Sequence, residues 1–235
     1  MKGNYFQSNL QISSMDRRIL NVLATCPLFA TMSELELDLT LSSVSHRVVD
    51  YAKRDVYALA GMPCRYADIV LTGELVCRMS SLSGKQVEVS RLRPGNLVAP
   101  AFVFAKDRSL PVSVETEVPT SVFRLRPETL QELIDTNATI RMNFIRVLSQ
   151  IDVFLTHRMK VLSLFTVREK VASMLLEQAG KQNSNVIQLD QSRQVIADSF
   201  GIQKYSLLRV LSEMQDNGAI HIKGKQIEIL DRSLL

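Results

Sequence analysis

A single helical pattern of unusual length constrains this 235-residue chain more than any other feature. From Asn137 to about Leu164, apolar side chains recur at alternating intervals of four and three residues, which places them on one face of an α-helix. Such a helix is longer than one small domain can bury, so it predicts a coiled-coil spine between two copies of the chain. A core helix of a helical domain is the alternative. The predicted dimer face consists of Ile140, Phe144, Val147, Leu148, Ile151, Phe154, Leu155 and Leu162.

A different pattern precedes this helix, between about residues 47 and 126. Short apolar runs, such as Ile69-Val70-Leu71 and Val112-Ser113-Val114, alternate with turn signals, such as Thr72-Gly73 and Pro94-Gly95. Many short strands with turns at intervals of about 8–12 residues are typical of a β-sandwich or jelly roll. With helices on both sides, the fold class is predicted to be α+β.

Helical signals flank the strand-rich segment. Residues 16–46 have a helical pattern that is interrupted at Cys26-Pro27, and Ser33 is a suitable N-cap. Further on, Thr166 and Glu169 have the spacing of a capping box for a helix that ends at Gly180. The sequence therefore predicts a sensor domain over 16–136, a dimerisation helix over 137–165 and a third domain over 166–235.

The last 70 residues contain the most specific signal. After a strand at 186–189, Ser192 caps a short helix to Phe200, Gly201 ends that helix, and a second helix runs from Lys204 to Asn217. Two short helices joined by a glycine-containing turn form a helix-turn-helix. Two alternating runs about Lys223-Gly224-Lys225 add a β-hairpin, so the motif is predicted to be a winged helix-turn-helix.

In this motif the second helix enters the major groove of DNA, and its N-terminal residues contact base edges. Arg209 and Lys204 can donate to guanine, and Gln203 can contact adenine or phosphate. Ser192, Arg193 and Lys225 have positions suited to phosphate. The predicted DNA-binding residues are Ser192, Arg193, Gln203, Lys204, Tyr205, Ser206, Arg209 and Lys225. A polar helix face in a protein-binding winged helix is the alternative.

Composition and the absence of certain motifs exclude several other classes of protein. The formal net charge is +4, and residues 166–235 have nine Lys or Arg against eight Asp or Glu, so DNA contact depends on where a few cations point. Three His residues far apart, with no glycine-rich phosphate loop, give no catalytic constellation, so we expect no enzyme. No apolar run could span a membrane, and the N-terminus lacks the apolar core of a signal peptide, so a cytoplasmic location is expected.

The chain resembles the CRP/FNR family of bacterial transcription regulators over nearly its whole length. The resemblance rests on Leu92-Arg93-Pro94-Gly95-Asn96-Leu97-Val98 with Asp107-Arg108-Ser109, on Ser192-Arg193-Gln194, and on the run from Phe200 to Ser206. It implies a cyclic-nucleotide-binding-type jelly roll that senses an effector, and a homodimer that binds a pseudo-palindromic operator in double-stranded DNA. RNA polymerase is a further implied partner. Tyr205 stands where the family usually has Glu, which implies an altered operator.

The chain departs from the family pattern at residues that would bind the effector. The pocket implied by the resemblance consists of Ala99, Pro100, Ala101, Arg108, Ser109, Leu155 and Thr156. Cyclic-AMP-binding members have Gly-Glu-Leu where this chain has Ala99-Pro100-Ala101, and Pro100 can neither accept a hydrogen bond from ribose nor donate a backbone N–H. Cyclic AMP is therefore disfavoured. The three cysteines, Cys26, Cys64 and Cys77, are scattered, which disfavours an iron–sulfur cluster.

Within the family, Gly84-Lys85-Gln86, Ala99-Pro100-Ala101 and Leu110-Pro111-Val112 are most similar to the HcpR-like subgroup, which implies a haem cofactor and a link to nitric oxide and nitrosative stress. The candidate axial ligands are His46, Met62, Cys64 and His157. No pair of them has diagnostic spacing, and each has a structural alternative as a surface, helix-interface or core residue. A regulatory protein that binds a small molecule and has no DNA role is the alternative function.

Overall fold

The computed structural model describes residues 15–80 and 86–235. The signal-peptide prediction concerns the N-terminal residues, which lie outside this part, as do Gly84 and Lys85. The described residues divide into two compact units, residues 15–80 with 90–150 and residues 86–89 with 151–235. Within the described ranges, no helix has both the length and the hydrophobicity of a membrane span.

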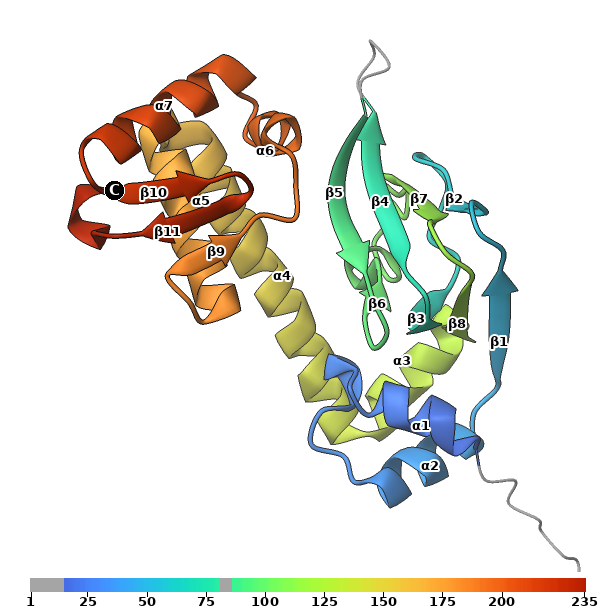
Figure 1. Ribbon diagram of the computed structural model, residues 1–235. Coiled ribbons are helices and arrows are strands. Elements are labelled where there is room, and N and C mark those ends of the chain that lie inside the picture. The colour runs from blue at the N-terminus through green and yellow to red at the C-terminus, as the bar shows by residue number, and fades with distance from the viewer. Residues whose placement is uncertain (1–14, 81–85) are drawn as a thin grey trace, which may run out of the picture. The chain divides into compact units, whose positions relative to one another are not determined.

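The predicted strands form two four-stranded sheets (Figure 1), which lie in the first unit except for residues 86–89. In one, β1 (His46–Tyr51) and β3 (Ala67–Thr72) flank β8 (Thr120–Leu125) in antiparallel register, and β6 (Leu97–Val98) pairs with β3. The other has the order β2 (Val56–Ala58), β7 (Ser113–Thr116), β4 (Leu75–Ser80) and β5 (Gln86–Leu92). These sheets confirm the predicted β-sandwich and the α+β class.

The helices α1 (Arg17–Leu23) and α2 (Glu34–Ser42) precede the sheets, with a 3₁₀ turn, η1 (Pro27–Phe29), at the predicted interruption. Ser33 caps α2 as predicted: its hydroxyl accepts from the Glu36 N–H, and the Glu36 carboxylate accepts from the Ser33 N–H at 2.8 Å. The helical prediction to residue 46 is wrong at its end, because His46 already pairs with Leu125 in the sheet.

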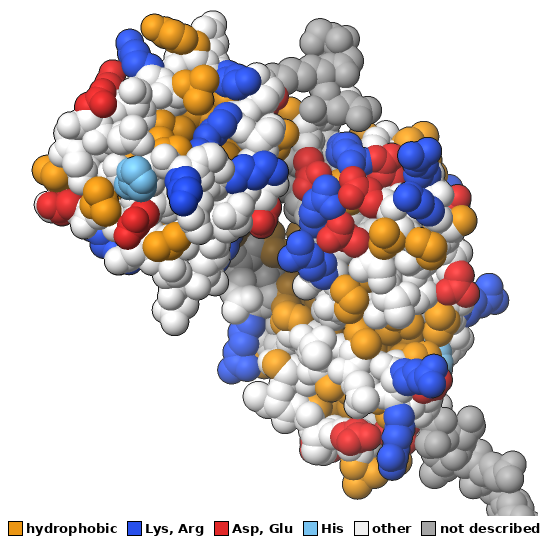
Figure 2. Space-filling model, in the orientation of Figure 1, with side chains coloured by type: hydrophobic (Ala, Val, Ile, Leu, Met, Phe, Trp, Pro, Cys, Tyr) orange, Lys and Arg blue, Asp and Glu red, His pale blue; other side chains and the backbone are white. Residues whose placement is uncertain are grey.

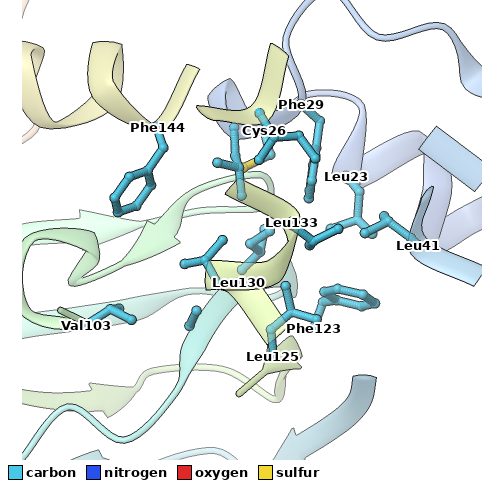
Figure 3. Close-up of a cluster of buried hydrophobic side chains, with 14 of the residues drawn as sticks. Leu23, Cys26, Phe29, Leu41, Val103, Phe123, Leu125, Leu130, Leu133 and Phe144 are labelled. Carbon is cyan, nitrogen blue, oxygen red and sulfur yellow. The ribbon is translucent and has the colours of Figure 1, made fainter. Parts of the chain in front are cut away.

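The core of the first unit corrects part of the predicted dimer face. Figure 3 shows Phe144 of α4 (Ala138–Leu164) in the same buried cluster as Phe123 of β8 and Leu130 of α3 (Pro127–Thr136). Ile140 is 0% exposed, Phe144 7% and Val147 8%. Assigning these three residues to a dimer interface was wrong, because side chains already buried within one chain have almost no surface left to bury against a partner.

The second unit has the elements predicted for the C-terminal domain. They are α5 (Val167–Gln182), β9 (Val186–Gln188), α6 (Arg193–Ser199), α7 (Lys204–Asp216), the hairpin β10 (Ile220–Lys223) and β11 (Gln226–Ile229), and a final 3₁₀ turn, η3 (Arg232–Leu234). β11 pairs with both β10 and β9 in a three-stranded sheet. Figure 1 shows this sheet together with α5, α6 and α7.

The capping box of α5 is observed, since the Glu169 N–H donates to the Thr166 hydroxyl and the Thr166 N–H to the Glu169 carboxylate. The predicted end at Gly180 is wrong. The helix continues to Gln182, and Asn183 provides the left-handed residue, at φ +47°. Asn tolerates this conformation better than most residues, so it can end a helix much as Gly does.

Candidate DNA-binding interface

The helix-turn-helix consists of α6, the turn at Gly201 and α7. The Ser192 hydroxyl accepts from the Val195 N–H at 3.3 Å and so starts α6 as predicted. Gly201 has φ +64°, a conformation that glycine adopts without steric cost. Ile196 of α6 and Leu207 of α7 are buried in one cluster, which fixes how the two helices pack.

The solvent face of α7 carries most of the residues predicted to read bases. Gln203, Lys204 and Arg209 are exposed, and Tyr205 is 72% exposed. Ser206 is half-buried. The Arg209 Nε lies 3.6 Å from the Glu213 carboxylate, one turn further on, in a solvent-exposed pair that costs little to exchange for another partner. Figure 2 shows Lys and Arg side chains spread among apolar ones over this part of the second unit.

Sequence reasoning missed Leu208 on the same face, where it is 43% exposed. Buried Leu207 and Leu211 define the inner side of α7, so the register of the helix alone would have placed Leu208 on the outer side. A large exposed leucine beside cationic residues adds an apolar surface to an otherwise polar helix face.

The wing lies next to α6 through a contact that the sequence did not predict. The Arg193 Nη2 donates to the Gly224 carbonyl at the hairpin turn, at 3.3 Å. Arg193 is half-buried, and burial lowers the pKa of its guanidinium. Arg193 therefore helps to position the turn, whereas Ser192 and Lys225 are exposed at the places proposed for phosphate contacts.

α4 also presents an exposed row of side chains, which overlaps the predicted dimer face in part. These residues follow the 3-4 spacing of a coiled-coil seam, and one of them, Asp152, is charged. The row consists of Ile145, Leu148, Asp152, Leu155, Met159 and Leu162, all exposed except the half-buried Leu148. The predicted dimer face includes Leu148, Leu155 and Leu162 of this row but not Ile145 or Met159. Ile151 and Phe154 lie outside this register.

The residues implied for the effector pocket come from both units of the chain. Ala99 has a left-handed backbone at φ +47°, and Pro100 begins the 3₁₀ turn η2 (Pro100–Phe102). Arg108 and Ser109 are exposed, and the Ser109 N–H donates to the Asp107 carboxylate at 2.9 Å. Ala101 is exposed as well. Leu155 and Thr156 are exposed on α4 and belong to the second unit.

The four haem-ligand candidates do not form a ligand set. His46 stacks on Phe123, with centroids 4.9 Å apart, and His157 is exposed on α4 in the other unit. The Met62 sulfur accepts from the Leu59 N–H, and the Cys64 thiol donates to the Tyr66 carbonyl. Burial raises the pKa of Cys64, which disfavours the thiolate that binds iron. In the described part of the chain, no three His, Cys, Asp or Glu side chains gather as metal ligands. These side chains do not fit an axial haem site.

Two domain families match the chain in the order in which the units occur. Residues 48–137 match the cyclic nucleotide-binding domain, and residues 169–235 match the Crp-like helix-turn-helix domain. A sensor-type β-domain followed by this winged helix-turn-helix defines a class of transcription regulators. Both domains of the chain therefore resemble those of CRP/FNR-type transcription regulators.

Relatives of known name agree with this assignment. The chain is 28% identical over 126 residues to the transcriptional activator FnrA of Stutzerimonas stutzeri, and 30% identical over 128 residues to the transcriptional activator Anr of Pseudomonas protegens. Each match covers 52% of this chain and 52% of the relative, so the chain spans about half the length of the curated relatives it matches. These relatives are regulators and not enzymes.

Solved structures share the fold. FixK2 from Bradyrhizobium japonicum has a TM-score of 0.60 at 20% identity, over 81% of this chain and 95% of FixK2. CprK in complex with OCPA has a TM-score of 0.64 at 12% identity, over 80% of this chain and 87% of CprK. At these identities the likeness concerns the fold alone.

Proposed function

We propose that the protein is a homodimeric transcription regulator that reads double-stranded DNA with α7. One observation carries this proposal: Lys204, Tyr205 and Arg209 are exposed on the helix that follows the Gly201 turn. In a winged helix-turn-helix this is the helix that enters the major groove, where Lys and Arg can donate to guanine. Gln203 and Ser206 add polar groups, while Ser192 and Lys225 supply phosphate contacts.

The exposed row on α4 supports the proposed dimer. Pairing Ile145, Leu155, Met159 and Leu162 with their counterparts in a second copy would bury apolar side chains that water now surrounds. A symmetric dimer presents two α7 helices, and these match a pseudo-palindrome when they meet major grooves about 34 Å apart. RNA polymerase is a further proposed partner, by analogy with activator relatives.

The proposed sensor is the segment 16–136, most of which lies in the first unit. The proline at position 100 and the occupied N–H of Ser109 favour an effector other than cyclic AMP. The haem or nitric-oxide link rests on the subgroup resemblance and has no support from the candidate ligands. A visible absorption spectrum after haem addition tests it: a stoichiometric Soret band supports the link, and a featureless spectrum removes it.

The proposal is tested by selecting operators from a random duplex library and measuring affinity by fluorescence anisotropy at several salt concentrations. We expect a selected site with two-fold symmetry and an affinity that falls steeply with salt, because cations on the protein displace counterions from DNA. Light scattering should give a dimer. A monomer with no selected sequence would refute the proposal and favour a small-molecule-binding protein without a DNA role.

A further inference from the structure

Arg158, near the end of α4, reaches the turn of the helix-turn-helix. Its Nη2 donates to the carbonyl of Ser199 at 2.7 Å, and its guanidinium carbon lies 5.1 Å from the centroid of the Phe200 ring. Ser199 ends α6, and Phe200 is its C-cap and is buried. All three residues belong to the second unit. One side chain of α4 therefore makes a hydrogen bond and a cation–π contact at the same point of the motif.

The contact is electrostatically suited to this place. The last carbonyls of a helix have no partner within the helix and carry the negative end of its dipole, so a cation there is favourable. The turn uses the two preceding carbonyls itself, since the Phe200 and Ile202 N–H groups donate to Ala197 and the Gly201 N–H to Asp198. Arg158 satisfies the next carbonyl in the series, that of Ser199.

Because of its position, this contact also affects the direction of α7. Only Phe200, Gly201, Ile202 and Gln203 separate the end of α6 from the start of α7, so whatever fixes this turn on α4 also fixes the direction of α7. Apolar burial, such as that of Val161 in the same core cluster, is itself non-directional. A charged hydrogen bond is directional and selects one orientation of the turn.

We propose that Arg158 is a positioning residue that fixes the helix-turn-helix on α4 and thereby aligns α7 with the dimer spine. The proposal rests on the DNA-binding function proposed above. Arg158 acts through the Ser199 carbonyl and the Phe200 ring, and makes no contact with DNA. A change in the register of the α4 pair would then reach α7 through this side chain.

Arg158→Met tests this with Lys160→Met as the matched control. Lys160 is an exposed cation two residues further along α4, and its Nζ lies 6.0 Å from the Phe165 ring, so its loss removes the same charge but no contact with the turn. Arg158→Met should weaken selected-operator binding at least about tenfold, because a charged hydrogen bond is lost. Lys160→Met should stay within about twofold. The slope of log affinity against log salt should not change in Arg158→Met, whereas loss of a phosphate contact would lower it by about one.

Amide hydrogen exchange on the DNA-free protein separates positioning from general stability. We expect faster exchange in Arg158→Met at the Phe200, Gly201 and Ile202 amides, with the interior of α5 unchanged, because only the turn is loosened. Uniformly faster exchange, a lower salt slope, or unchanged affinity would each overturn the proposal. If the wild-type protein selects no operator, the proposed function fails, while the exchange experiment still decides whether Arg158 holds the turn.

A second variant keeps the test decisive if Arg158→Met folds poorly. Phe200→Leu retains an apolar side chain in the core and removes only the aromatic face under Arg158. It should lower operator affinity by a smaller factor, and the double variant should be no weaker than Arg158→Met alone, since both changes disrupt one contact. Fully additive losses would contradict the proposal.

Discussion

Arg124 of β8 and Asp68 of β3 form a forked ion pair across adjacent strands of the first unit. The Arg124 Nη2 lies 2.6 Å from Asp68 Oδ2, and Nε lies 3.0 Å from Oδ1. Asp68 is 0% exposed and also accepts from the Tyr57 hydroxyl at 2.9 Å. A buried carboxylate is tolerated here because its oxygens are satisfied and its charge is neutralised.

Replacing Arg124 with Met should therefore destabilise the protein by about 3–5 kcal/mol, because the substitution leaves Asp68 buried without its counter-charge. Arg93→Met is the control: Arg93 also pairs with a carboxylate, that of Glu74 at 3.2 Å, but its side chain is 72% exposed. Removing this surface pair should cost less than about 1 kcal/mol. Urea unfolding measures both, and equal losses would contradict the assignment of Arg124–Asp68 as a buried pair.

The same site predicts a pH dependence. Burial raises the pKa of the Asp68 carboxyl above its ordinary value, although the hydrogen bonds from Arg124 oppose this. A raised folded-state pKa means that the stability contribution is complete below the unfolded pKa and is lost as the pH rises through the folded pKa. Arg124→Met removes the opposing effect, so this variant should regain stability relative to wild type between pH 7 and pH 5. The double variant Arg124→Met/Asp68→Asn has no carboxyl at this position and should show no such recovery.

Much of the fold could be predicted because its signals are local. The caps at Ser33, Thr166 and Ser192 and the turn at Gly201 depend on residues within a few positions of one another, and all four are observed. The Asp68–Arg124 pair could not be predicted, because 56 residues separate its members in the sequence and only strand pairing brings them together.

Prediction of the dimer face from the sequence meets a different limit. A helix that packs against its own chain on one side and presents a seam on another has two apolar stripes, and spacing alone does not separate them. Ile140 and Leu155 satisfy the same sequence pattern, yet one is buried in the core of the first unit and the other is exposed. Tertiary packing decides between the two stripes.

The exposed row on α4 predicts opposite effects for two neighbouring substitutions. Leu155→Glu should raise the dimer dissociation constant at least about tenfold, because an apolar contact is replaced by two facing charges. Asp152→Leu should lower it, since Asp152 places two carboxylates in the seam. Leu35→Glu is the control, because Leu35 is also an exposed leucine but lies on α2. The molecular mass, measured by light scattering across a dilution series, gives the dissociation constant of each variant. A dimer unaffected by Leu155→Glu would place the interface elsewhere.

On α7, Arg209→Ala should cost about 1–3 kcal/mol of operator binding and relax the preference at one base pair of each half-site, because a bidentate contact with guanine is lost. Arg232→Ala is the control within the same unit. The Arg232 guanidinium donates to the Asn185 side chain at 2.8 Å and lies outside the proposed interface. Competition against operators with single base changes measures the preference, and an unchanged preference in Arg209→Ala would remove Arg209 from the set of residues that read bases.

Leu208 should recognise thymine. It is exposed between Lys204 and Arg209 on a helix face that otherwise offers polar groups, and the 5-methyl group of thymine is the apolar feature of the major groove. Replacing the contacted thymine by deoxyuridine removes only that methyl group, so affinity should fall about fourfold per half-site, as for one buried methylene. In Leu208→Ala the same replacement should have no effect, whereas thymines elsewhere in the operator should behave alike in both proteins. If no thymine-to-deoxyuridine change distinguishes wild type from Leu208→Ala, Leu208 does not read a base even though the protein binds its operator.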